Sequence, residues 1–171
     1  MSYAIVYDSR TGNTEALARA VAAALPSEGR LAFGRVDEVD RAAVAQADRG
    51  YAGFRTNRGE CGDELAEVLA SLADKDVFLF GTAGFGADET YFAGVMARVA
   101  VHLPESARIV GTFMCQGRMP ASVRARYAQT AEAKPEQGAR MHQLIEDFDE
   151  AASHPDDDDL ARLREAVQAA S

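Results

Sequence analysis

The chain has no tryptophan and only two cysteines among its 171 residues. Cys61 and Cys115 show no CxxC or metal-ligand spacing, so the sequence predicts neither a disulfide framework nor a structural zinc site. No apolar run approaches the roughly 20 residues that span a bilayer, and the start of the chain has no basic segment followed by a long apolar stretch. We therefore expect a cytoplasmic protein without membrane insertion.

Positive charge is also scarce. The sequence has 18 Lys and Arg residues against 27 Asp and Glu residues, which gives a formal net charge of −9 and a pI near 4.8. Binding to nucleic acid by counterion release needs a concentrated basic surface, so we expect no nucleic-acid partner. The acidic balance suits docking to a basic face of a partner protein, where complementary charge mainly raises the association rate.

Short apolar segments alternate with segments of helical period from the first residue onward. This order is typical of an α/β fold with a doubly wound parallel sheet and helices on both faces. We expect a single domain over residues 1–171, with a core of about 1–150 and a C-terminal helical extension of about 151–171. The five expected strands cover residues 3–7, 31–39, 51–54, 76–80 and 108–114.

Beyond residue 115 the pattern becomes helical throughout. Helices are expected from Pro120 towards Ala131, after Pro135, and from the four aspartates at 156–159 onward. These aspartates are either a cation site or negative charge that offsets the dipole of a helix N-terminus. A calcium loop needs alternating ligands, a glycine and a distant Glu, which favours the second interpretation.

A polar turn directly follows the first expected strand. It consists of Ser9, Arg10, Thr11, Gly12, Asn13 and Thr14. The turn opens a helix, whose first amides have no partner within the helix and whose dipole is positive at this end, so it predicts a site for a phosphate monoester. The glycine lets the backbone come close to a bound group. The alternative is an ordinary polar helix cap, because Ser, Thr and Asn all favour caps.

The pattern Ser/Thr-x-Thr-Gly-Asn-Thr after an N-terminal strand resembles the FMN phosphate loop of the flavodoxin family. It has neither the Lys of a Walker loop nor the Gly-x-Gly-x-x-Gly of a dinucleotide turn. The resemblance covers about residues 1–115 and implies a flavodoxin-like fold with strand order 2-1-3-4-5 and FMN as cofactor. The segment 113–120 is similar to a subgroup of stand-alone flavodoxin-like proteins from anaerobic bacteria, and some flavodoxin-like partners in bilin reduction look similar.

The resemblance also implies that three loops converge on the flavin at the carboxyl ends of the strands. The first loop would hold the phosphate, and the loops at 55–62 and 82–91 would hold the isoalloxazine ring. Besides the first loop, the expected cofactor-binding residues are Phe54, Arg55, Thr56, Asn57, Thr82, Ala83, Gly84, Phe85, Gly86 and Tyr91.

Two of these residues are candidates for stacking on the flavin. Residues 88–91 resemble the Asp-x-x-Tyr segment of many flavodoxins, which makes Tyr91 the first candidate and Phe85 the second. Alternatively, Tyr91 belongs to the apolar face of the following helix. Many flavodoxins carry a Trp in the second loop, where this chain has Arg55. That Arg stacks its guanidinium plane on the flavin, stabilises an anionic reduced form of the flavin, or is a solvated side chain.

No nucleophile with a base, carboxylate pair or metal-ligand cluster stands beside the expected site, and the three histidines are scattered. We therefore expect no catalytic residue and no metal. The first hypothesis is an FMN-binding carrier of low-potential electrons between a reductase or ferredoxin-type donor and an acceptor enzyme. The alternatives are an FMN-dependent reductase of a quinone, tetrapyrrole or other conjugated acceptor, and a flavin-free interaction module. Arg118, Arg124 and Arg126 form either a basic docking patch or a solvated helix face.

Overall fold

The structure is a computed structural model that describes residues 1–85 and 88–171. Within these residues a five-stranded parallel sheet has the order β2-β1-β3-β4-β5. The strands are β1 (Tyr3–Tyr7), β2 (Arg30–Arg35), β3 (Arg49–Arg55), β4 (Asp76–Ala83) and β5 (Arg108–Gln116). The expected fold class and strand order are confirmed.

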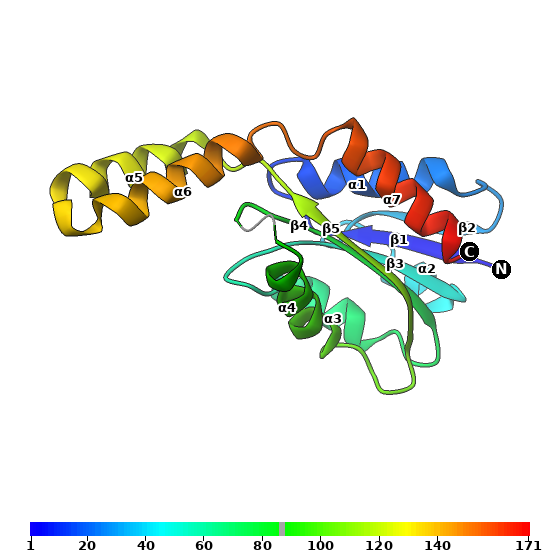
Figure 1. Ribbon diagram of the computed structural model, residues 1–171. Coiled ribbons are helices and arrows are strands. Elements are labelled where there is room, and N and C mark those ends of the chain that lie inside the picture. The colour runs from blue at the N-terminus through cyan, green and yellow to red at the C-terminus, as the bar shows by residue number, and fades with distance from the viewer. Residues whose placement is uncertain (86–87) are drawn as a thin grey trace.

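Helices cover both faces of the sheet (Figure 1). On one face lie α1 (Asn13–Ala24) and α7 (Asp157–Ala169), whose Leu17 and Leu163 pack with Ile5 of β1. On the other face lie α2 (Arg41–Gln46), α3 (Asp63–Ala70) and α4 (Glu89–Ala100), which pack with Ala4 and Val6. Because successive side chains of a strand point to opposite faces, β1 contributes to both apolar layers.

Four strands differ in length from the sequence prediction: β3 and β4 extend beyond the expected 51–54 and 76–80, and β2 and β5 end elsewhere than expected. β2 ends at Arg35, because the segment after it turns and the amide of Val39 donates to the Arg35 carbonyl (2.8 Å). β5 continues to Gln116, two residues beyond the expected end, and pairs with β4 up to Ala83. Because the strands are parallel, the loops that follow β2 and β5 lie at the same edge of the sheet.

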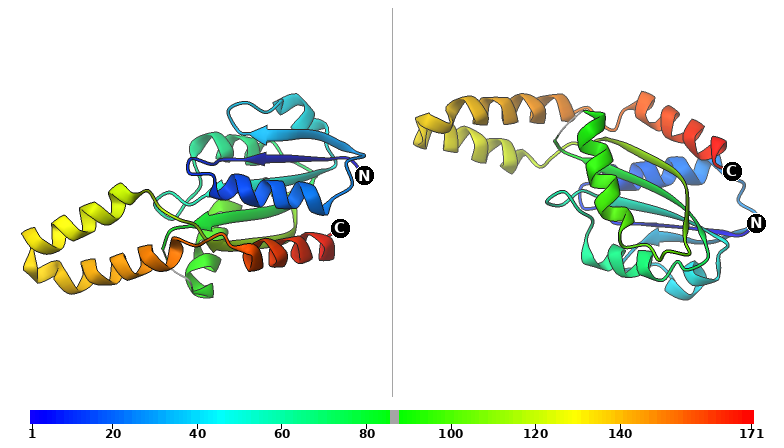
Figure 2. Two further views of the ribbon diagram at one scale, coloured as in Figure 1. Left: turned by 90° about the horizontal axis from the view of Figure 1, so that it is seen from above. Right: turned by 60° about the horizontal axis from the view of Figure 1, so that its bottom comes forward.

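The remaining helices form a hairpin that projects beyond this edge (Figures 1 and 2). It consists of α5 (Ala121–Ala133), the short 3₁₀ helix η1 (Pro135–Gln137) and α6 (Gly138–Ala151), and its two long helices pack mainly on each other. The hairpin closes where the amide of Arg118 donates to the carbonyl of His154 (2.9 Å). None of the described helices is long and apolar enough to cross a membrane.

Candidate functional site

Hydrogen bonds between backbone groups gather the loops at the carboxyl edge of the sheet. The amide of Thr56, after β3, donates to the carbonyl of Thr82 in β4 (2.8 Å). The amide of Gly117, after β5, donates to the carbonyl of Ala83 (3.0 Å). The loops that follow β3, β4 and β5 thus meet at the edge where the strand order reverses next to β1, the position at which open parallel sheets bind ligands.

The first loop is not an ordinary helix cap. Gly12 is the N-cap of α1, with φ of 87° in the left-handed region that favours glycine, and no side chain accepts a hydrogen bond from the first turn. By contrast, the carboxylates of Asp40, Asp88 and Asp156 cap α2, α4 and α7. The hydroxyls of Ser9 and Thr11 and the first amides of α1 are therefore available to an anion at the positive end of this helix.

Three buried polar atoms beside this loop have no hydrogen-bond partner among the described residues. They are Ser9 Oγ, Asn13 Oδ1 and Thr56 Oγ1. Ser9 is only 8% exposed and Asn13 only 6%. The amide nitrogen of Asn13 donates to the carbonyl of Arg118 (2.8 Å), which fixes the orientation of the unpaired oxygen. Since a buried unpaired polar group costs about 1–3 kcal/mol, these atoms indicate a polar ligand.

A cavity of about 220 Å³ opens beside these atoms and brings most of the predicted residues together. Within its lining the hydroxyl oxygens of Thr14 and Thr82 lie 3.1 Å apart. The predicted residues that line it are Ser9, Arg10, Thr11, Asn13, Thr14, Arg55, Thr56, Thr82, Ala83 and Gly84.

Two predicted residues, Phe54 and Tyr91, lie away from both this cavity and its neighbour. Phe54 is fully buried in the core, with its ring against Gly81 of β4. Tyr91 is half-buried and packs against the apolar layer beneath α3 and α4, the alternative that the sequence left open. Gly86 lies outside the described residues.

Two further predicted residues border the cavity region. Phe85 is half-buried, and its ring centre lies 6.2 Å from that of Tyr127 in α5, so the loop after β4 touches the hairpin. Asn57 lines a second cavity of about 390 Å³, which shares Ser9, Arg10 and Arg55 with the first. Arg55 Nε lies 3.2 Å from Asp8 Oδ2, so its charge is partly balanced within the site.

The sequence prediction missed the loop after β5. Gly117, Arg118, Met119 and Pro120 complete the lining of the first cavity. A Cβ atom on Gly117 would stand 2.6 Å from the amide nitrogen of Asn13, so the glycine makes room for that side chain. The rule that ligands bind beyond the carboxyl ends of parallel strands could have predicted this loop, because β5 ends at the same edge as the other strands.

Both cysteines are buried thiols. Burial raises the pKa of Cys61 to about 11, and the nearby charge of Glu60 adds to the effect. Burial also raises the pKa of Cys115, with a smaller contribution from Asp159. The thiolate is the reactive form, so neither residue has the electrostatic setting of a nucleophile.

At the start of α7, ring or carboxylate atoms of His154, Asp156 and Asp159 lie within 4.8 Å of one another. The carboxylate of Asp159 accepts hydrogen bonds from His154 Nδ1 (2.6 Å), from the amide of Asp156 (3.0 Å) and from Arg162. Asp156 in turn caps the helix and completes a capping box with Asp159. These contacts support the interpretation of the aspartates as charge at a helix N-terminus.

A polar, uncapped loop at the switch point of a 2-1-3-4-5 parallel sheet defines a flavodoxin-type domain, and residues 4–168 match the family model described as a flavodoxin domain. The chain belongs to this family, which supports a redox protein with a flavin cofactor.

Individual relatives agree with this assignment. The flavodoxin-like domain-containing protein BilS of Clostridium symbiosum is 36% identical over an alignment of 177 positions, which covers 96% of this chain and 93% of that protein. Oxidised Flavodoxin 2 from Bacillus cereus has a similar fold, with a TM-score of 0.57 at 18% identity over 99% of this chain and 97% of that one. A flavoprotein from Lactobacillus acidophilus, solved in complex with FMN, has a TM-score of 0.50 at 12% identity over 67% and 93% of the two chains.

Proposed function

We propose that this chain binds FMN and carries electrons between redox proteins. The proposal is supported above all by the unpaired Ser9 Oγ and Asn13 Oδ1 beside the uncapped N-terminus of α1. In this proposal the hydroxyls of Ser9 and Thr11 and the first amides of α1 donate to the phosphate. Asn13 Oδ1 and the Thr56 hydroxyl bind hydroxyl groups of the ribityl chain.

The flavin supplies the one- and two-electron chemistry when bound. The chain's own residues bind it, orient it and set the local charge, to which Arg10 and Arg118 contribute at the lining of the cavity. Across the part of the chain that the structure describes, the lining of this cavity contains no carboxylate and no thiol, and this composition suits a carrier better than an enzyme with its own acid or base.

One observation favours direct reduction of an organic acceptor as the second candidate. The contact between Phe85 and Tyr127 joins the loop after β4 to the hairpin, and the side chain of Met119 lies against Gly84. Together these groups give the cavity region an apolar wall against which a flat conjugated molecule would pack.

The first experiment is a fluorescence titration of the apoprotein with FMN and riboflavin at matched ionic strength. We expect FMN to bind at least about 100-fold more tightly, because only FMN offers a phosphate to two or more charge-assisted hydrogen bonds. Equal affinities for FMN and riboflavin would contradict the phosphate site. If neither ligand binds, the flavin cofactor is contradicted and the flavin-free interaction module becomes the favoured hypothesis.

A turnover assay distinguishes the carrier hypothesis from the direct-reductase hypothesis. The FMN-loaded protein is mixed with a nicotinamide cofactor as the electron donor and a quinone as the acceptor, without any partner protein. The carrier hypothesis predicts no steady turnover until a partner reductase is added. Steady turnover without a partner would contradict the carrier and establish the direct reductase.

A further inference from the structure

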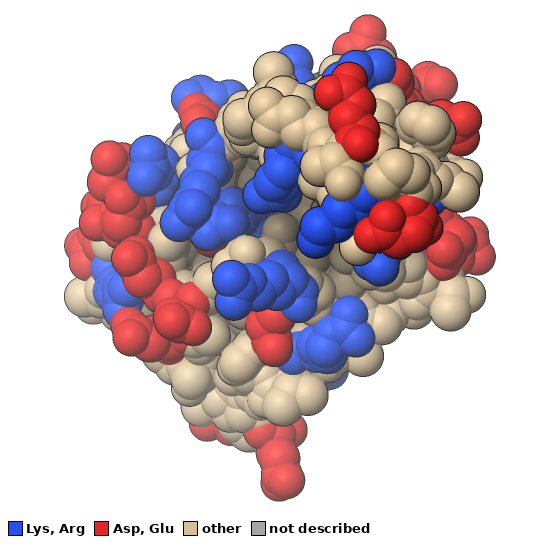
Figure 3. All heavy atoms as spheres, turned by 90° about the vertical axis from the view of Figure 1, so that its left-hand side faces the viewer, with Lys and Arg blue, Asp and Glu red and all other residues tan. Residues whose placement is uncertain are grey.

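The carboxyl edge of the sheet carries charge opposite to that of the whole chain. Figure 3 views this edge and shows Lys and Arg side chains gathered around a central hollow, with Asp and Glu mostly towards the periphery. The formal net charge of the chain is −9, so this face is a local exception. Such a local field acts on the approach of a charged partner.

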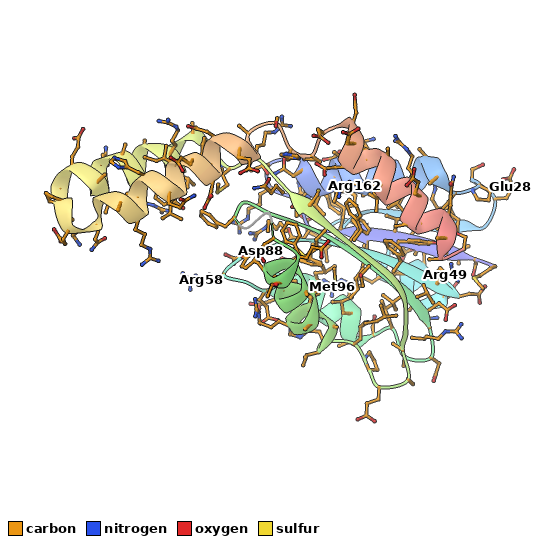
Figure 4. The ribbon with its side chains drawn as sticks, viewed as in Figure 1. Glu28, Arg49, Arg58, Asp88, Met96 and Arg162 are labelled. Carbon is orange, nitrogen blue, oxygen red and sulfur yellow. The ribbon has the colours of Figure 1, made fainter. Side chains whose placement is uncertain are left out.

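Five arginines make up this feature, which we call the arginine rim: Arg10, Arg55, Arg58, Arg98 and Arg118. Arg10, Arg55 and Arg118 line the first cavity. Arg58 is exposed on the loop after β3, at the carboxyl edge, whereas Arg49 marks the opposite end of that strand (Figure 4). Arg98 reaches from α4 to the same loop and donates to the carbonyl of Gly59 (2.7 Å).

Most arginines of the rim lack an ion-pair partner, which they share with Arg30, Arg126, Arg140 and Arg164 among the described residues. Among the described residues, only Arg55 of the rim has a carboxylate within 4.0 Å, that of Asp8. Ion pairs elsewhere neutralise many arginines, as in Arg19–Glu15, Arg41–Glu67, Arg108–Asp76, Arg124–Asp149 and Arg162–Asp159. Arg10, Arg58, Arg98 and Arg118 of the rim therefore have no carboxylate at ion-pair distance among the described residues.

Carboxylates close to the rim are engaged by other groups. Glu60 Oε1 lies 2.8 Å from His102 Nε2, and the carboxylate of Asp88 accepts a hydrogen bond from the amide of Tyr91 (2.6 Å). Asp63 and Glu64, at the start of α3, line the second cavity together with the rim residues Arg10 and Arg55, but neither acid forms an ion pair with a rim arginine among the described residues. None of these acids lies within ion-pairing distance of Arg58 or Arg98 among the residues described.

The phosphate of a flavin would account for part of the rim. A phosphate monoester carries about −1.5 to −2 charge near neutral pH, and Arg10 and Arg118 adjoin the first loop that is proposed to hold it. Arg58 and Arg98 belong instead to the loop after β3 and to α4. The phosphate of the flavin therefore does not account for the charge of Arg58 and Arg98, which is available to a second partner.

We propose that the arginine rim docks an acidic face of a redox partner protein, beside the projecting α5–α6 hairpin. This rests on the proposed function, since electrons would pass at the flavin site that the rim surrounds. The inference reverses the expectation from net charge, which favoured a basic partner. At about 0.1 M salt the Debye length is about 10 Å, so the rim acts at contact while the negative charge of the far side is screened.

The test uses the full chain with two probes, an acidic bacterial ferredoxin and the basic mitochondrial cytochrome c. Binding of each dye-labelled probe is followed by fluorescence anisotropy, with and without FMN, at about 0.1 and 0.5 M NaCl. We expect the ferredoxin to bind more tightly than cytochrome c and to lose about tenfold in affinity at the higher salt concentration. Tighter binding of cytochrome c would overturn the proposal.

Two variants with the same charge change sharpen this test. Arg58→Glu changes the rim, whereas Arg30→Glu changes the start of β2, at the amino ends of the strands. We expect Arg58→Glu to weaken ferredoxin binding about tenfold and Arg30→Glu to change it less than about twofold. Equal effects of the two variants on ferredoxin binding would overturn the proposal that the rim is the docking surface.

A separate FMN titration of the same variants distinguishes the two proposals. If the wild-type chain fails to bind FMN, the proposed function fails, whereas the charge-dependent binding of the probes is measured without the flavin. If FMN binds and the probes show no preference, the rim alone is contradicted.

Discussion

At the scale of single residues, the site depends on how Asn13 is held. Its amide nitrogen donates to the Arg118 carbonyl across the cavity, while its oxygen is buried and unpaired. The loop after β5 therefore positions a side chain of the first loop, and Gly117 leaves the space in which this happens. The two segments are more than 100 residues apart in sequence, as the separation of 105 positions between Asn13 and Arg118 shows.

Gly117→Ala tests this arrangement. The new Cβ would stand 2.6 Å from the Asn13 nitrogen and displace that side chain, so we expect FMN affinity to fall about tenfold in a fluorescence titration. The matched control is Gly138→Ala at the start of α6, where nothing lies within 4 Å of the added atom. That variant should keep its FMN affinity and gain about 0.5–1 kcal/mol in unfolding free energy. Unchanged affinity in Gly117→Ala would contradict the role of the loop after β5.

The first loop could be predicted from sequence because its chemistry is local. Ser9 to Thr14 are consecutive, and the turn, the glycine and the helix start are all visible in one window. The placement of Tyr91 could not be predicted, because it depends on which face α4 turns to the apolar layer. The contact between Phe85 and Tyr127 depends on the path of a distant hairpin, which no local pattern encodes.

At the scale of elements, α7 packs on the sheet through its apolar face, and a capping network holds its start. Leu163 and Val167 are fully buried beside α1, and the helix start is held by the Asp159 carboxylate, whose side chain is 2% exposed. Helical period predicted α7 and the hairpin helices equally well. It did not predict that α7 covers the sheet while α5 and α6 project, because an amphipathic face fits a sheet as well as another helix.

Asp159→Ala measures how much the capping network at the start of α7 contributes to the free energy of unfolding. The substitution removes the acceptor of the His154 ring, of the Asp156 amide and of Arg162, and we expect a loss of about 2–3 kcal/mol in unfolding free energy by urea denaturation. Asp158→Ala removes an exposed charge from the same helix turn and should cost about 0.5 kcal/mol. A loss in Asp159→Ala no larger than in Asp158→Ala would show that the capping network adds nothing to stability.

At the scale of the whole molecule, Asp76 joins three strands and the C-terminal segment at the amino edge of the sheet. Its carboxylate pairs with Arg108 of β5 (2.7 Å) and with Arg49 of β3 (3.2 Å). Arg49 also donates to the carbonyl of Ala170 (2.6 Å). Burial raises the pKa of Asp76, but hydrogen bonds from the two arginines outweigh it and hold the pKa below its ordinary value of 3.8.

The acid dependence of stability follows from this pKa. A carboxyl group whose pKa is lowered by folding contributes its full stabilisation above its ordinary pKa and loses it as the pH falls through the folded value. Asp76→Asn should therefore destabilise the protein at about pH 7, and the difference from the wild type should shrink towards about pH 2. Urea unfolding at both values checks this, with Glu132→Gln on the exposed surface of α5 as the control. A difference that stays constant with pH would contradict the ion pair.

The hairpin has a consequence for how such a protein diversifies. Its two ends meet where the Arg118 amide reaches the His154 carbonyl, so residues 121–151 leave the sheet and return to it at nearly one point. A hairpin attached in this way can change its length or its surface without disturbing the strand register or the first loop. Transplanting the hairpin between relatives would thus change the surface beside the candidate site while the sheet and the first loop stay the same.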